Sequence, residues 1–260
     1  MKLKTSEEQI MKNRKKFYNG IMQRYIFREA IYTLIGLSYK NQTHRRIICF
    51  LYGKFSTKIV TLQLEYKYMT KVEDILKIKA TLLYIAGKFD KGVDYIKLFK
   101  LLYLAQKAHL SKYGRPIVND DFYAMKAGPA PSVMYNICKV ADGERSEQDL
   151  EDTARSISVQ TKKMPKGNDV KYVTVCESPD MDELSTSDIE CIDEVYAKYG
   201  KLTSSKLSTI THDSAWKKNW DEEKAEGQKI GLLDIASAAG VNESMMKYIQ
   251  ENLMLNGIVC

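Results

Sequence analysis

Two prolines separated by one residue stand directly ahead of a helical pattern, in the stretch KAGPAPSVMY over residues 126–135. Proline fixes its own φ and disfavours helical dihedrals in the residue before it, so the chain ahead of Pro131 must be extended. Pro131 itself suits the first turn of a helix. That helix would begin at Ser132, with an apolar stripe of Val133, Met134, Ile137 and Val140. The sequence therefore predicts an extended segment joined at a fixed angle to a helix.

Helical periodicity dominates the rest of the chain from residue 70 onward. Apolar residues recur at helical spacing over residues 72–85 and again over residues 95–111. Gly114 suits a C-terminal cap of the second helix, and Pro116 cannot continue it. Caps and apolar stripes predict further helices over residues 185–200, 204–212, 232–239 and 243–254.

Two segments of alternating polarity, residues 156–161 and 171–177, predict a β-hairpin that turns at Pro165 and Gly167. Residues 122–126 suit a strand or an extended loop, and the acidic stretches 143–152 and 221–228 suit loops. The predicted class is α+β, a mainly helical single domain with a small antiparallel sheet.

Basic charge is concentrated in the first quarter of the chain. Residues 1–68 carry 14 Lys and Arg against 4 Asp and Glu, whereas residues 69–260 carry 26 against 29. A boundary between a basic N-terminal extension, 1–68, and a mildly acidic domain, 69–260, is therefore expected. The extension suits an arm that binds nucleic acid or a membrane surface. The alternative is a true start at Met69, ahead of a Thr70-x-x-Glu73 capping box, with residues 1–68 outside the native protein.

Composition and motif spacing argue against several classes of function. The five cysteines form no close pair and the three histidines have no ligand spacing, so neither a metal site nor a cofactor is expected. No apolar run reaches the ~20 residues that span a bilayer, and no secretory signal is visible. Nucleotide-binding and hydrolase signatures are absent, so no small-molecule substrate is expected. The expected setting is the reducing cytoplasm.

Two histidines have a functional and a structural interpretation. His212 and Asp213, followed by Ser214, contain the residue types of a hydrolase, but neighbours in sequence rarely face each other on a helix. In the structural interpretation, which we favour, His212 ends one helix, Asp213 or Ser214 caps the next and Trp216 anchors it in the core. His109 lies on an apolar helix face, where a core histidine bonded to nearby backbone is favoured over a general base or a ligand.

The run KLLYLAQKAHLSKYGRPIVNDDFYAMKAGPAPSVMYNI, residues 100–137, resembles the core of the Panacea domain family of SocA-like, phage-associated antitoxins. The shared pattern is His-Leu-x-x-Tyr-Gly-Arg-Pro, an extended piece and a Gly-Pro-x-Pro turn into a helix. LSTSDIECIDEVYAKYG and the later His-x-x-x-Trp pair resemble its second half, within residues 184–216. Ala127 departs from the large residue that usually precedes Gly-Pro. On this resemblance, five residues maintain the fold: His109, Gly114, Gly128, His212 and Trp216.

The resemblance implies a non-enzymatic antitoxin that neutralises a cognate protein toxin by binding it. Because Arg and Tyr concentrate interface energy, we expect binding at a rim around the proline turn. The candidate residues are Tyr113, Arg115, Lys126, Pro129, Pro131 and Tyr135. The alternative is that this motif only maintains the fold, with Arg115 bonded to carbonyls. A second candidate function is a transcriptional regulator that contacts operator DNA through residues 1–68, and a third is a hydrolase centred on His212 and Asp213.

Overall fold

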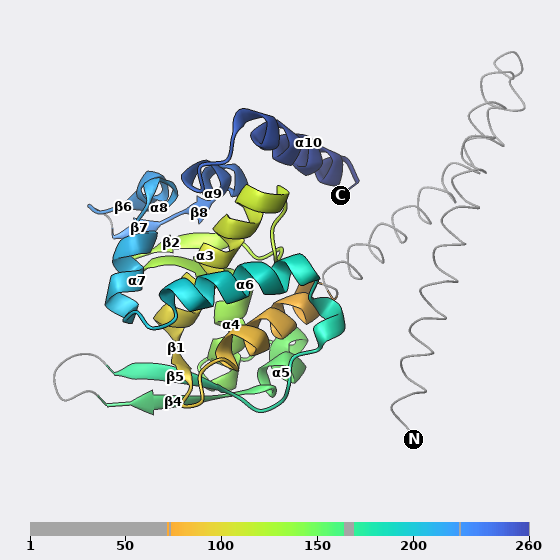
Figure 1. Cartoon of the computed structure of the whole chain (residues 1–260). Helices are drawn as coiled ribbons and strands as arrows, with labels where there is room; N and C mark the ends of the chain where they lie inside the picture. Colours follow the sequence, from red (N-terminus) through yellow and green to blue (C-terminus); the bar gives the residue numbers. More distant parts are fainter. Residues whose placement is uncertain (1–71, 73, 164–168, 224, 260) are drawn as a thin grey trace, which may run out of the picture. The chain divides into compact units, whose positions relative to one another are not determined.

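The computed structural model describes residues 72, 74–163, 169–223 and 225–259, with side chains described as far as residue 254. The basic extension 1–68, its boundary at residue 69, the capping box at Thr70 and the turn at Pro165 and Gly167 lie outside these residues. The body that remains is mainly helical with small antiparallel sheets, which confirms the predicted α+β class (Figure 1). None of the described helices has the length and apolarity needed to cross a membrane.

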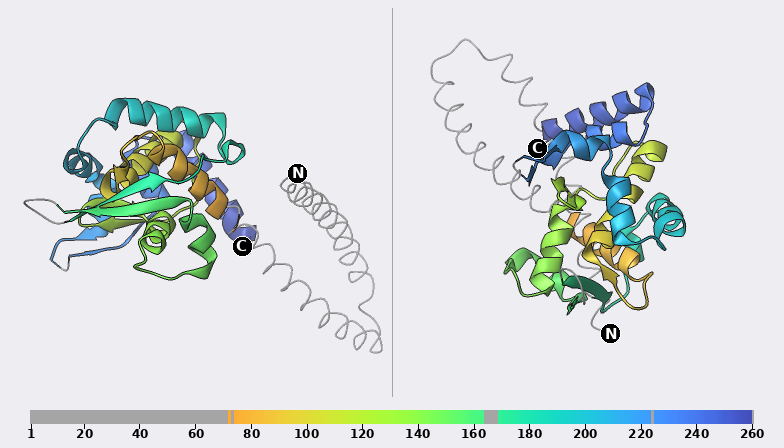
Figure 2. Two further views of the ribbon diagram at one scale, coloured as in Figure 1. Left: turned by 90° about the horizontal axis from the view of Figure 1, so that it is seen from below. Right: turned by 90° about the vertical axis from the view of Figure 1, so that its left-hand side faces the viewer.

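One helix, α3 (Tyr95–Tyr113), forms the centre of this body. Its N-cap Asp94 accepts a hydrogen bond from the Lys97 amide at 3.0 Å, and Gly114 ends it in the left-handed conformation at φ 66°, as predicted. More than half of its residues are buried, because other elements pack on several of its sides. Figure 2 shows α6 (Thr186–Tyr199) on one side of the body and α4 (Ser132–Ala141) with α5 (Gln148–Ala154) on the other.

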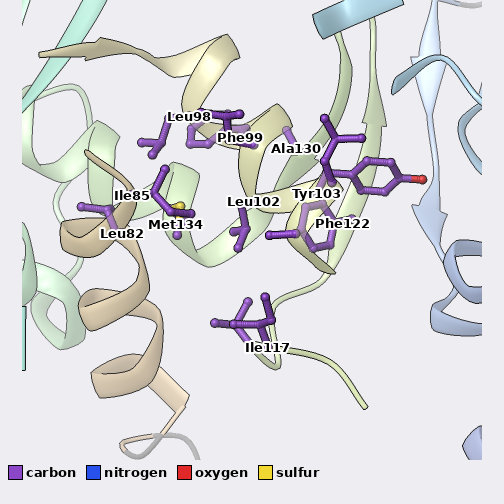
Figure 3. Close-up of a cluster of buried hydrophobic side chains, with 14 of the residues drawn as sticks. Leu82, Ile85, Leu98, Phe99, Leu102, Tyr103, Ile117, Phe122, Ala130 and Met134 are labelled. Carbon is purple, nitrogen blue, oxygen red and sulfur yellow. The ribbon is translucent and has the colours of Figure 1, made fainter. Parts of the chain in front are cut away.

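The hydrophobic core lies between α3 and its neighbours. Figure 3 shows Leu82 and Ile85, from the helix over residues 74–86, beside Leu98 and Leu102 of α3 and Met134 of α4. Each of these five side chains is at most 1% exposed. Burial of one such side chain contributes about 2 kcal/mol. The apolar stripes that the sequence predicted therefore meet in a single core.

Two three-stranded antiparallel sheets flank this core. In the first, the order is β1 (Val93–Asp94), β5 (Val170–Val175) and β4 (Ile157–Lys162), so the predicted hairpin forms and gains a third strand. In the second, the order is β3 (Gly128–Pro131), β2 (Phe122–Met125) and β8 (Lys229–Ile230). The GPAP segment is thus a strand paired with β2, with Pro131 opposite Phe122.

The remaining elements include the four helices predicted over residues 185–254, which form α6, α7 (Ser204–Thr211), α9 (Leu232–Ala238) and α10 (Glu243–Val259). A 3-10 turn η1 (Met181–Glu183) leads to α6, which Ser185 and Asp188 open with a capping box. The other elements are α8 (Ser214–Asn219), β6 (Trp220–Asp221) and β7 (Glu226–Gly227). Gly240, at φ 73°, separates α9 from α10, as predicted.

Two predicted loops are wrong in part. The stretch 143–152 contains most of α5, whose Leu150 and Ala154 are buried and whose first-turn acidic residues suit the positive end of the helix dipole. The stretch 221–228 contains part of the β6–β7 hairpin. Gly227 makes that hairpin possible, because a Cβ there would lie 1.3 Å from the Ala124 carbonyl oxygen. The polar sequence of these two stretches indicates neither the burial of the α5 side chains nor the close approach of Gly227 to Ala124.

A buried carboxylate holds the junction between β3 and α4. Pro131, the N-cap residue of α4, provides no side-chain cap. Asp120, 7% exposed, accepts hydrogen bonds from the Val133 and Met134 amides, both at 2.9 Å, and from the Ser132 hydroxyl at 3.1 Å. The first amides of a helix have no partner within the helix, and Pro131 has no side-chain oxygen to accept from them. Asp120, which precedes β2 in the sequence, accepts from them instead.

We expect Asp120→Ala to lower the free energy of unfolding by about 2 kcal/mol, because it leaves two helix amides buried without an acceptor. Urea denaturation measures this change. Asp121→Ala is the matched control, since Asp121 is half exposed and pairs with the exposed Lys229 at 2.7 Å; its cost should stay within about 0.5 kcal/mol. Equal losses in the two variants would contradict the capping role.

Candidate functional site

A buried lysine lies beneath the proline junction, which we define as residues 128–131. Lys100 of α3 is 2% exposed, and its Nζ donates a hydrogen bond to the Pro129 carbonyl oxygen at 2.7 Å. Gly128 passes directly over this side chain at φ 103°, where a Cβ would lie 2.8 Å from Lys100 Cε and 2.9 Å from Thr211 Oγ1. Position 128 therefore requires glycine for both its backbone conformation and its close packing.

Three alternate carbonyls, from Met125 to Pro129, are held by side chains of other elements. Besides the Pro129 carbonyl, the Ala127 carbonyl accepts from the Ser208 hydroxyl of α7. The Met125 carbonyl accepts from Trp216 Nε1 of α8 at 2.9 Å. Side chains 81 and 91 positions away in the sequence thus fix the backbone of the β2–β3 turn. The outcome is a stiff turn whose position is set by α3, α7 and α8 together.

The corner between α7 and α8 is built as the structural interpretation predicted. His212 ends α7, and Asp213 caps α8 by accepting from the Ala215 and Trp216 amides at 3.1 and 3.2 Å. Asp213 also accepts from Lys107 Nζ at 2.5 Å and from the Tyr103 hydroxyl at 3.2 Å. Its carboxylate is therefore committed to a helix cap and an ion pair.

An aromatic stack completes this corner. The His212 ring lies 3.7 Å from the Trp216 ring at an angle of 11°, and Trp220 stacks on Trp216 at 5.6 Å. Trp216 is 8% exposed and belongs to the hydrophobic core, as expected of an anchor. The Nε2 atom of His212 is buried, and within the described part of the chain it has no hydrogen-bond partner. This arrangement favours packing over proton transfer at His212.

Burial sets the ionisation of the groups around the junction. Desolvation lowers the pKa of Lys100 to about 7. Burial, followed by the positive charges of Lys100 and Lys217, lowers the pKa of His212. Burial and the neighbouring Asp213 carboxylate raise the pKa of Tyr103. The buried surroundings of the junction therefore disfavour the positively charged forms of Lys100 and His212.

A second polar cluster lies at the far end of α3. His109 is fully buried, and its Nδ1 lies 2.7 Å from the Arg115 carbonyl oxygen, which can only accept, so Nδ1 donates this hydrogen bond. Its Nε2 lies 3.1 Å from both the Ser187 hydroxyl and an Asp188 carboxylate oxygen. His109 is thus a core histidine bonded to nearby backbone, as the sequence predicted.

Asp188 joins this cluster to the helix over residues 74–86. Its carboxylate is fully buried and lies 2.9 Å from Lys77 Nζ. Although desolvation raises the pKa of Asp188, hydrogen bonds from His109, Lys77 and Ser185 outweigh it and hold that pKa below its usual range. The charged carboxylate thus ties α3, α6 and the helix over residues 74–86 together.

The six predicted partner-binding residues lie in two places. Lys126 is exposed at the β2–β3 turn, Pro129 and Pro131 are buried beside it, and Tyr135 packs partly buried against the rings of Tyr95 and Phe99. Tyr113 lies at the other end of α3, and Arg115 follows it. At a rise of 1.5 Å per residue, Tyr113 is about 20 Å along the helix from Lys100.

At that far end, Tyr113 and Arg115 bond to α6 and its N-cap. The Tyr113 hydroxyl donates to Glu190 at 2.9 Å, and the exposed Arg115 guanidinium donates to the Ser185 and Ser187 hydroxyls at 3.2 and 2.8 Å. These acceptors are hydroxyls, so the expectation that Arg115 bonds to carbonyls is wrong. A single rim around the proline turn does not form, and the binding role of the six residues stays a prediction.

Sequence reasoning missed Lys100, Tyr103 and Asp120, which organise the junction. Lys100 and Tyr103 are polar residues inside the apolar pattern of α3, and that interruption was the available signal. Within the described residues, no group of His, Cys, Asp and Glu side chains is arranged to hold a metal ion.

Comparison with known proteins gives one family. Residues 98–217 match the model described as antitoxin SocA-like, Panacea domain. The matched range begins in α3 and ends in α8, so it contains the proline junction and the α7–α8 corner. No curated protein and no solved structure gives a significant match to the chain.

The low pKa of Lys100 predicts a characteristic pH dependence of stability. The unfolded chain keeps this amine protonated up to about pH 10.5, so above pH 7 the unfolded state binds more protons and stability rises with pH. Between pH 7 and 9 we expect the free energy of unfolding to rise by about 2 kcal/mol more in the wild type than in Lys100→Met. Urea denaturation across this range measures both slopes, and equal slopes would contradict a buried, neutralised amine.

Proposed function

We propose that this protein is a cytoplasmic antitoxin that neutralises a cognate protein toxin by binding it directly, because residues 98–217 carry an antitoxin SocA-like, Panacea domain. The observation that carries the proposal is the family match over the segment that builds the proline junction. Neutralisation by binding requires a rigid surface and no turnover. The β2–β3 turn and the junction after it provide such rigidity, since three of their carbonyls are held from outside.

The state of His212 and Asp213 supports binding in preference to hydrolysis. A catalytic base needs a partner that orients it and an open path to its substrate. Asp213 instead caps α8 and pairs with Lys107, while the His212 ring is stacked against Trp216. Both residues thus serve the corner that positions the β2–β3 turn.

The net charge of residues 69–260 indicates which charge the toxin should carry. Residues 69–260 carry three more acidic than basic side chains, and complementary charge speeds association and favours correct partners. A basic toxin that acts on RNA or the ribosome fits this balance. Operator binding through residues 1–68 is the alternative function, and it depends on residues outside the described structure.

Co-expression with the protein encoded by the adjacent gene tests the proposed function. We expect the wild type to restore growth in cells that express the toxin, and the two proteins to elute together in size-exclusion chromatography. His212→Asn should still restore growth, because a binding frame needs no base at this position. Rescue that is lost in His212→Asn while its folding and toxin binding persist would favour a hydrolase instead.

Lys126 offers a test of the predicted binding surface. Its side chain is exposed at the β2–β3 turn, so we expect Lys126→Ala to weaken toxin binding by about tenfold without changing the melting temperature. Lys201→Ala, which removes an equally charged exposed side chain after α6, is the matched control and should leave the Kd unchanged. Calorimetric titration measures both values. Equal affinities for the two variants would remove Lys126 from the interface.

A further inference from the structure

One edge of the β1–β5–β4 sheet is formed by β4. The Cys176 amide donates to the Ser156 carbonyl at 2.8 Å in the same register that pairs Ile157 with Val175. Because opposed residues of an antiparallel pair alternate between bonded and non-bonded, Ser158 and Gln160 direct their backbone groups toward β5. The amides and carbonyls of Ile157, Val159 and Thr161 therefore point away from the sheet.

This edge has few of the features that protect exposed strands. The strand ISVQTK is six residues long and contains neither proline nor glycine, and only its last residue is charged. Within the described structure, the backbone groups of Val159 and Thr161 have no hydrogen-bond partner on the outer side, and these two residues are more exposed than Ile157, which is buried. In Figure 1, β4 forms the outer side of the hairpin that extends from the body.

A shallow depression lies at the beginning of the same edge. Its apolar lining includes Val140 and Ala141 from α4 and Ile157 from β4, and its charged lining residues are Arg145, Arg155 and Glu151. The Arg155 side chain is 75% exposed and pairs with an almost fully exposed Asp152. Such an exposed pair contributes little energy, so the guanidinium remains available to another carboxylate.

The charges at the two ends of β4 distinguish between possible occupants. Arg155 precedes the strand, and Lys162 and Lys163 end it, so both ends are basic. If β4 paired antiparallel with a second copy about Val159, Arg155 would lie opposite Lys163 of that copy. Like charges placed directly opposite each other are destabilising, which disfavours self-pairing and favours a strand with acidic ends.

We propose that an extended segment of the toxin, with an acidic residue near each end, adds to β4 as a fourth strand of this sheet. This inference rests on the proposed antitoxin function and names the chemistry of its contact. Backbone hydrogen bonds to Val159 and Thr161 supply affinity, and the basic ends select the partner. The acidic balance of the whole body guides encounter with a basic toxin, whereas this edge recognises one local segment of it.

Amide hydrogen exchange measured by NMR tests the inference on the full chain, alone and with saturating toxin. We expect the amides of Val159 and Thr161 to exchange at least tenfold more slowly in the complex. The amides of Ser158 and Gln160, already bonded to β5, should change less. A complex in which the two outer amides keep their free-state rates overturns the inference and leaves the antitoxin function intact, whereas the absence of any complex overturns both.

A variant pair gives an independent measurement. Thr161→Pro removes one outward amide at a position where an edge strand tolerates proline, while Thr161→Ala keeps that amide and shortens the side chain. We expect the Kd for the toxin to rise at least tenfold in Thr161→Pro and less than threefold in Thr161→Ala, with both variants folded by circular dichroism. Equal affinities would overturn the inference. Concentration-dependent protection of the outer amides without toxin would identify a second copy as the occupant and would also overturn it.

Discussion

The hydrogen bond from buried Lys100 to the Pro129 carbonyl is the interaction on which the rest of the structure depends. An amine at this depth is costly unless it is bonded or neutral, and burial lowers its pKa to about 7. The bond fixes β3 over α3. Residue 128 must be glycine, because a Cβ there would lie too close to the Lys100 side chain. Once β3 is placed, Asp120 can cap α4, and Trp216 and Ser208 can reach the carbonyls of the β2–β3 turn.

Local signals in the sequence predicted much of this fold. Gly114, Ser185 and Asp213 act within a few residues of their own positions, so a cap motif or a change in periodicity was sufficient to place them. The two prolines likewise determined an extended segment and a helix start through their own dihedral limits.

Contacts between distant residues could not be predicted in the same way. Lys100 meets Pro129 across 29 positions, and Trp216 meets Met125 across 91, so no local pattern records either contact. The β6–β7 hairpin was missed for the same reason, since it depends on the approach of Gly227 to Ala124. The single predicted rim failed because the 19-residue length of α3 separates Arg115 from the proline junction.

The central claim is that this protein inactivates a toxin by binding it, without chemical turnover. Titration of toxin activity with increasing amounts of the purified protein tests that claim most directly. Binding predicts that activity falls linearly to an end point at a fixed molar ratio, and that toxin recovered from the complex has an unchanged mass and regains its activity. Inactivation of many toxin molecules by one molecule of this protein, or a lasting change in toxin mass, would contradict the account.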